Sequence, residues 1–343
     1  MRKLGYLNRR GVRARGSKTI CGGGAGQGET NMKKPGMVLL AVTEVLLMAV
    51  SALAQKPAVQ GYGRAVVTIL PKHSQELPVA VRSGEVRIKV DGKQARITGW
   101  TPLRGANTQT QLVLLIDDSA RQSLGTQWSY IKNFVEEMPH HTQMAIAYME
   151  YGRAVLSGPL SSNPAVVLRG LHIPANFAYG NASPYFCLSN LAKHWPSQNR
   201  AARRVVLMIT DGVDEYYLRY NPEDPYVLAA IHDSVRAGLI VYALYWRNRG
   251  FVDGTGYGSY DGQSLLEEVT QATGGENFWI GIGDPVTFSP FFRELRTDLA
   301  HQYELRFAAP HISKPGVEYL HLKVIAPAVK IITPQKVYVR AAS

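Results

Sequence analysis

The apolar residues in the middle of the chain follow two alternating patterns. Residues 112–116 form an uninterrupted apolar run, and apolar residues then recur at helical spacing from Leu124 to Val135. A short apolar run that leads into an amphipathic period predicts a buried parallel strand followed by a helix. The alternation continues, and it predicts strands over 144–148, 205–209, 239–244 and 278–280 and helices over 185–195, 226–237, 264–273 and 290–300. Repeated units of this kind predict an α/β fold, with a doubly wound, mostly parallel sheet covered by helices on both faces.

The flanking segments, residues 62–105 and 303–340, are patterned differently. Apolar and polar residues alternate over 65–70 and 86–90, and an Asp91-Gly92 pair follows. This alternation around an Asp-Gly pair predicts an antiparallel hairpin. Because no Pro- or Gly-rich linker separates either segment from residues 106–302, we expect the two segments to pair into a small β unit beside the α/β sheet. The strands expected in the C-terminal segment are 303–307, 321–325, 329–332 and 337–340.

The first 54 residues are typical of a targeting sequence. Residues 37–54 are mostly apolar, two lysines precede them, and they end in Ala-Leu-Ala. These features predict a secretory signal peptide over 32–54 and export of the mature chain, to the periplasm or the outside of the cell. The alternative is an uncleaved membrane anchor, which Glu44 makes costly. Residues 1–31 show no apolar period and are interpreted as an over-extended start or a disordered leader.

The formal net charge of +12 is concentrated in this leader. Residues 1–54 hold 9 of the 38 Lys and Arg residues and 2 of the 26 acidic residues, which gives them +7 and leaves +5 for the rest of the 343 residues. A small excess without blocks of like charge does not indicate a nucleic-acid partner. The glycine-rich run 22–28 is followed by Glu29 where a phosphate-binding loop has lysine, so no nucleotide site is expected either.

Polar residues with oxygen ligands follow two of the expected strands. Asp117 and Ser119 come directly after the first strand, and Asp211 comes after the strand 205–209. Ligands in doubly wound folds bind beyond the carboxyl ends of the strands, so these side chains are expected at one edge of the sheet, with Ser183 from the loop between them. Carboxylates and hydroxyls suit a hard cation such as Mg²⁺. Each Asp taken alone is also a good helix cap, which is the alternative interpretation.

In combination, these residues resemble the metal-ion-dependent adhesion site of the von Willebrand factor type A domain. That family has Asp-x-Ser-x-Ser after the first strand, a Thr from a second loop and an Asp-Gly turn after a later strand. Asp117 and Ser119 match the first motif, and Asp211 begins the Asp-Gly turn. Ser183 stands at the Thr position, which a one-residue shift would give to Ala182 instead. The resemblance to this family covers about residues 62–340. The segments on either side of the type A region resemble those of a branch of secreted acidobacterial proteins. It implies the Rossmann-like type A fold over residues 106–302, a Mg²⁺ ion that Mn²⁺ or Ca²⁺ can replace, and a protein partner rather than a substrate.

One position departs from the family, because Arg121 stands where the motif has its second Ser. A guanidinium does not ligate a cation. If Arg121 points inward, it bridges Asp117 and Asp211 and takes the place of the metal. If it points outward, the two carboxylates and the hydroxyls of Ser119 and Ser183 remain available to a hydrated ion.

The long connection 246–262 contains five glycines together with Tyr257 and Tyr260. Glycine and tyrosine are typical of adaptable binding loops, so these two tyrosines and Arg121 are candidate partner contacts. We therefore expect an exported protein-binding module and no enzymatic activity. The alternative is a metal-free structural or assembly component of the cell envelope, with Arg121 filling the site.

Overall fold

A computed structural model describes residues 60–72, 80–105, 108–175, 183–214, 216, 221, 223–247, 257–279, 283–325 and 329–341, with side chains in the segment 257–279 from residue 260 onward. These residues belong to one compact unit, Pro57–Ser343. The expected signal peptide and leader lie outside them, as does most of the connection 246–262. None of the helices in the described ranges is long and apolar enough to cross a membrane.

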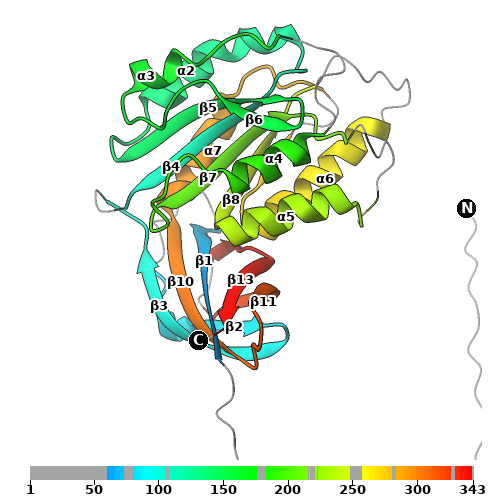
Figure 1. Ribbon diagram of the computed structural model, residues 1–343. Coiled ribbons are helices and arrows are strands. Elements are labelled where there is room, and N and C mark those ends of the chain that lie inside the picture. The colour runs from blue at the N-terminus through cyan, green and yellow to red at the C-terminus, as the bar shows by residue number, and fades with distance from the viewer. Residues whose placement is uncertain are drawn as a thin grey trace, which may run out of the picture. The chain divides into compact units, whose positions relative to one another are not determined.

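The middle of the chain forms a six-stranded sheet (Figure 1). Its order is β6 (Arg153–Leu156), β5 (Thr142–Glu150), β4 (Thr110–Asp117), β7 (Arg203–Thr210), β8 (Leu239–Tyr245) and β9 (Asn277–Phe278). Every pairing is parallel except that of β6 with β5. The chain reverses its direction of winding at β4, so the carboxyl ends of β4 and β7 meet at the point where such sheets bind ligands. The α/β class and the parallel sheet expected from the sequence are confirmed, whereas the edge strand β6 was not predicted.

Helices cover both faces of this sheet (Figure 1). The helices α2 (Trp128–Glu136), α3 (Pro164–Leu168) and α7 (Ser289–Ala300) pack on one face, preceded by the short 3-10 helix η2 (Gln122–Gln127). The helices α4 (Pro184–Lys193), α5 (Pro225–Ala237) and α6 (Tyr257–Thr273) pack on the other. Strand β4 is buried throughout because its alternate residues face the two layers: Leu112, Leu114 and Ile116 contact the first and Val113 and Leu115 the second.

The flanking segments form a second sheet, which is entirely antiparallel. It contains β1 (Gln60–Pro71), β2 (Val86–Val90), β3 (Lys93–Pro102), β10 (Gln302–Pro310), β11 (Gly316–Val324), β12 (Val329–Ile332) and β13 (Lys336–Ala341), and the 3-10 helix η1 (Ser83–Glu85) precedes β2. The predicted hairpin is present as β2 and β3, and the two segments pair as expected. The prediction of a small β unit was wrong, because β1 is 12 residues long and pairs with β10, β12 and β13. Its pairing with both β10 and β13 closes six strands into a barrel-like ring around a core of their own.

Buried polar side chains join the two sheets near the start of β7. The guanidinium of Arg203 donates to the Thr110 hydroxyl at 2.8 and 3.1 Å and to the side-chain oxygen of Gln302 at 2.9 Å. The amide of Gln302 in turn donates to the hydroxyls of Thr68 and Tyr242, each at 3.2 Å. Burial lowers the pKa of Arg203 to about 10. The junction is satisfied by neutral acceptors, which fixes β1 and β10 against the amino-terminal end of the parallel sheet.

Candidate functional site

Asp117 lies at the carboxyl end of β4 and is held by two neighbouring hydroxyls. Ile116 pairs with Ile209, which brings Asp117 level with Thr210 at the end of β7. One oxygen of Asp117, Oδ1, accepts hydrogen bonds from the Ser119 amide at 3.0 Å and the Ser119 hydroxyl at 2.7 Å. The other, Oδ2, accepts from the Thr210 hydroxyl at 2.7 Å. The side chain is fully buried, so its orientation is fixed by these contacts.

The Asp211-Gly212 turn packs directly against helix α6. Gly212 has a φ of +72°, a conformation that residues with a Cβ seldom adopt. A Cβ at Gly212 would lie 2.5 Å from the carbonyl oxygen of Gly262, and a Cβ at Gly262 would lie 2.3 Å from the carbonyl oxygen of Asp211. The Asp211 carboxylate accepts a hydrogen bond from the Val213 amide at 3.1 Å. The two glycines therefore permit the close contact that sets the position of Asp211 at the sheet edge.

Ser183 begins helix α4 and connects it to the loop that follows β7. Its hydroxyl oxygen accepts from the Tyr185 amide at 3.2 Å, and the hydroxyl donates to Asp214 at 3.0 Å. The Tyr185 hydroxyl donates to the carbonyl oxygen of Gly212 at 2.7 Å. Ser183 thus lies among the residues of the Asp211 loop, although its described hydrogen bonds are to Asp214 and Tyr185.

Negative charge gathers at this edge of the sheet. Asp117, Asp118, Asp211 and Asp214 are all buried. Burial raises the pKa of the Tyr185 hydroxyl well above its usual value, and the charges of Asp214 and Asp211 add to the shift. Burial, with the charge of Asp117 as the next cause, also raises the pKa of the Cys187 thiol. The carboxylates at this edge thus raise the pKa of two side chains in the first turn of α4.

The residues at this edge suit a hard cation. In the described ranges, no group of three or more His, Cys, Asp or Glu side chains is placed to hold a metal. Carboxylates and hydroxyls together would have to supply the ligands, and the buried set Asp117, Ser119, Ser183 and Asp211 consists entirely of oxygen donors. Mg²⁺ usually keeps several of its water ligands, so one or two protein carboxylates with a few other oxygen ligands are enough to bind it.

Arg121 points away from these aspartates. Its guanidinium lies 4.0 Å from the Asp284 carboxylate and is 37% exposed. Its backbone amide donates to the Arg247 carbonyl oxygen, and Asp284 also accepts from the Arg247 amide at 2.9 Å. The sequence left two orientations of Arg121 open, and the structure has the outward one. The alternative, in which Arg121 bridges Asp117 and Asp211, is therefore wrong. The reason is a tertiary contact, because the acid that attracts the guanidinium precedes α7.

The expected binding loop is shorter than the sequence suggested. Helix α6 begins at Tyr257 rather than at residue 264, so residues 257–262 are helical. Tyr260 lies on this helix and is 52% exposed. The side chain of Tyr257 lies outside the described residues, as do residues 180–182 beside Ser183. The sequence reasoning also missed Thr210, whose role depends on the register of β7 against β4.

Comparisons with known proteins give likenesses of fold only. No family model matches the chain, and no curated protein matches it. An aerotolerance-related membrane protein from Bacteroides fragilis is similar at a TM-score of 0.40 and 14% identity, over 55% of this chain and 98% of that one. The SpRpn10 VWA domain has a TM-score of 0.36 and 12% identity, over 56% of this chain and 98% of that one. Proximal thread matrix protein 1 from the mussel byssus, with a zinc-occupied MIDAS motif, has a TM-score of 0.38 and 17% identity, over 56% of this chain and 48% of that one. Type A domains, the family that the sequence resembles, are thus among the similar structures.

Proposed function

We propose that this chain is an exported protein-interaction module of the type A class, which binds its partner through Mg²⁺ at the edge formed by β4 and β7. One observation carries the proposal: the buried Asp117 carboxylate is oriented by the Ser119 and Thr210 hydroxyls next to the Asp211 turn. Three hydrogen bonds orient this carboxylate but bring no positive charge to it, and a bound cation would balance the buried charge.

Each residue of the site has a distinct part in this proposal. Asp117 and Asp211 supply the negative charge, and Ser119 and Ser183 supply hydroxyl oxygens. Thr210 is a positioning residue, since its hydrogen bond fixes the Asp117 carboxylate. A bound Mg²⁺ would supply an open coordination position for an acidic group of the partner protein, and Mn²⁺ or Ca²⁺ would serve in its place.

The outward orientation of Arg121 supports this function. A guanidinium 4.0 Å from Asp284 leaves the Asp117 carboxylate to its hydroxyl donors. Arg121 and Tyr260 are both partly or largely exposed, so either can contact a partner beside the site. We propose these two residues, together with Tyr257, as the contacts that distinguish one partner from another.

The alternative function is a structural one, because Asp117 already joins two strands. Its hydrogen bonds to Ser119 and Thr210 connect the ends of β4 and β7 through protein side chains alone. A metal-free structural or assembly component of the envelope would use Asp117 in this way only. The two functions differ in a single respect, which is whether the folded chain binds a divalent cation.

Thermal unfolding with EDTA and then with millimolar Mg²⁺ separates these functions. A ligand at 100 times its Kd stabilises the native state by about 2.7 kcal/mol, which for a fold of this size raises the Tm by about 5 °C. We expect a saturable shift in the natural chain and none in Asp211→Ala. Asp91→Asn is the matched control, because it removes one carboxylate charge at the β2–β3 turn and should keep the full shift. A chain that shows no shift with Mg²⁺, Mn²⁺ or Ca²⁺ is the structural component instead.

A further inference from the structure

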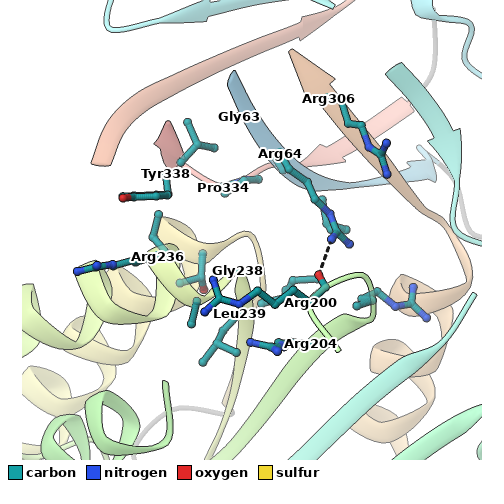
Figure 2. A pocket seen from close by; sticks show the side chains of 18 of the residues that line it. Gly63, Arg64, Arg200, Arg204, Arg236, Gly238, Leu239, Arg306, Pro334 and Tyr338 are labelled. Atoms are coloured by element: carbon teal, nitrogen blue, oxygen red, sulfur yellow. Dashed lines mark hydrogen bonds between the residues drawn. The ribbon is translucent and has the colours of Figure 1, made fainter. Parts of the chain in front are cut away.

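A second candidate site lies between the two sheets, at the end opposite the carboxylates. A cavity of about 600 Å³ is bounded by the amino-terminal ends of β7 and β8 and the end of α5 on one side, and by β1, β10 and β13 on the other. Figure 2 shows Arg200, Arg204 and Arg236 on the side of the α/β sheet and Arg64 across from them on β1. This volume is in the usual range for a ligand pocket. Asp117 ends β4 at the other edge of the parallel sheet, so the two sites are separate.

The lining of this cavity is strongly basic. Eight of the described residues that form it are Arg or Lys, and none of them is Asp or Glu. We call it the arginine cleft and define it by Arg64, Arg200, Arg204, Arg236, Arg306 and Lys336. Like charges gathered on the walls of a cleft focus a positive potential within it.

Few carboxylates offset these charges. Glu304 is shared by two arginines, since it lies 2.6 Å from Arg64 and 2.5 Å from Arg306. No ion pair within 4.0 Å is found for Arg200, Arg204, Arg236 or Lys336 among the residues that the structure describes. The cleft therefore retains a net positive charge after its internal ion pair is counted.

Three of the cations lie over aromatic rings instead. Arg204 is 5.6 Å from the centre of the Trp195 ring, and Arg236 is 6.0 Å from that of Tyr338. Lys336 is 5.4 Å from the ring of Tyr319. Contacts of this kind hold a cationic side chain in place without neutralising it, so each group keeps its capacity to bind an anion.

Arg204 shows the electrostatic strain of the cluster most clearly. It is only 8% exposed, and its Nε has no hydrogen-bond partner among the described residues. Burial lowers the pKa of its guanidinium, and the positive charges of Arg200 and Arg64 lower it further. An anion placed between Arg200 and Arg204 would offset the repulsion between these two side chains, which gives such a ligand a favourable free energy of binding.

The shape of the cleft favours an extended ligand over a compact ion. A neighbouring cavity of about 350 Å³ shares Arg200, Arg204 and Arg236 with it, and the one acid in its lining, Asp233, is paired with Lys193, so the net positive surface continues beyond the first cavity. The walls also include apolar surface from Phe307, Leu239 and other residues. A chain that carries carboxylates at intervals, with carbon atoms between them, matches both features.

We propose that the arginine cleft binds an acidic peptide segment of a partner protein. The Glu or Asp side chains of the segment would contact Arg200, Arg204 and Arg236, and its backbone would lie against the apolar wall. Arginine is suited to this because its planar guanidinium forms two parallel hydrogen bonds with a carboxylate. The site needs no metal, so its test is made in EDTA and is independent of the function proposed above.

The test measures the fluorescence anisotropy of a dye-labelled hexaglutamate peptide with the full chain. The double variant Arg200→Ala, Arg236→Ala removes two cleft charges whose side chains make no described hydrogen bond, so it should keep its fold and its Tm. We expect it to bind the peptide at least about tenfold more weakly, since contacts between charged groups are each worth about a factor of ten or more. The matched control is Lys89→Ala, Arg96→Ala, which removes two exposed charges from the β2–β3 hairpin and should change the affinity less than about twofold.

Each contrary result overturns the proposal. Equal weakening in both double variants would mean that the peptide responds to net charge and not to the cleft. Binding of tripolyphosphate without binding of hexaglutamate would assign the cleft to a phosphorylated ligand. No binding of the peptide at 50 mM salt, where such attraction is strongest, would remove the site altogether. If the cleft variant loses its fold, Lys336→Glu at the rim replaces it, with the same expected loss of affinity.

Discussion

Replacing Thr210 with valine removes one hydroxyl and leaves the volume of the side chain nearly unchanged. In the native chain this hydroxyl donates to Asp117 at 2.7 Å and accepts from the Gly212 amide at 3.2 Å, and Thr210 is fully buried. The variant therefore loses the hydrogen bond that Thr210 donates to the buried Asp117 carboxylate. It also leaves the Gly212 amide without the hydroxyl oxygen that accepts from it. A hydrogen bond to a charged group is worth about 1.5 to 3 kcal/mol, so we expect Thr210→Val to destabilise the fold by about 2 to 3 kcal/mol.

The assay is denaturant unfolding in EDTA, with the Tm measured in parallel. The expected loss corresponds to a fall in Tm of about 4 to 8 °C. Thr142→Val is the matched control, because Thr142 is also buried in the parallel sheet and its hydroxyl has no described hydrogen bond. It should change the stability by less than about 0.5 kcal/mol. If Thr210→Val were as mild as this control, the hydroxyl would not hold Asp117, and the argument for an oriented carboxylate would fail.

Two further predictions concern the surroundings of the site and the far end of the sheet. Gly262→Ala would place a Cβ 2.3 Å from the Asp211 carbonyl oxygen, so we expect it to destabilise the fold by about 1 to 3 kcal/mol. The rise in Tm that Mg²⁺ causes should also be smaller than in the natural chain. An unchanged rise would show that α6 does not position Asp211. Asp298 is fully buried, and burial followed by the charge of Glu276 raises its pKa to about 8. The folded state thus keeps a proton that the unfolded chain releases near pH 4. The contribution of Asp298 to the free energy of unfolding is therefore fully present below pH 4 and is lost as the pH rises to about 8. Asp298→Asn should flatten the curve of unfolding free energy against pH in this window, and an identical slope in both proteins would refute the shift.

Local sequence signals predicted the parts of the fold that depend on near neighbours. The hairpin at Asp91-Gly92 is confirmed, since Val90 pairs with Lys93 across that turn. The helix expected over 226–237 is α5, which begins one residue earlier because the Asp224 carboxylate accepts from the Tyr226 and Val227 amides. In both places the turn or cap residues act within a few positions of the element that they define.

The elements that were missed depend on contacts between distant residues. Strand β6 is a short edge strand with partly exposed side chains, and its apolar run, Ala-Val-Leu, is too short to mark it in the sequence. The start of α6 was taken for a loop because of its glycines, yet Gly262 is required where the helix meets the Asp211 turn. Closure of the second sheet depends on β1, which pairs with residues more than 200 positions away.

The same division applies to the candidate site. Asp117, Ser119 and Asp211 were identified from their spacing after the strands, and the structure brings Asp117 and Ser119 into contact. Thr210 was missed because its contact with Asp117 follows from the register of two strands 93 residues apart. The direction of Arg121 could not be read from the motif, since Asp284 attracts it from a distant segment.

The most direct test of the central claim is a titration of the chain with Mn²⁺, followed by the relaxation rate of the water protons. A bound Mn²⁺ that keeps exchangeable waters enhances this rate, and a carboxylate that displaces a water reduces the enhancement. We predict one Mn²⁺ per chain, an enhancement that falls when acetate is added, and loss of binding in Asp211→Ala but not in Asp91→Asn. An unenhanced relaxation rate at millimolar Mn²⁺, or an enhancement that survives Asp211→Ala, would contradict a metal-dependent interaction site at the ends of β4 and β7.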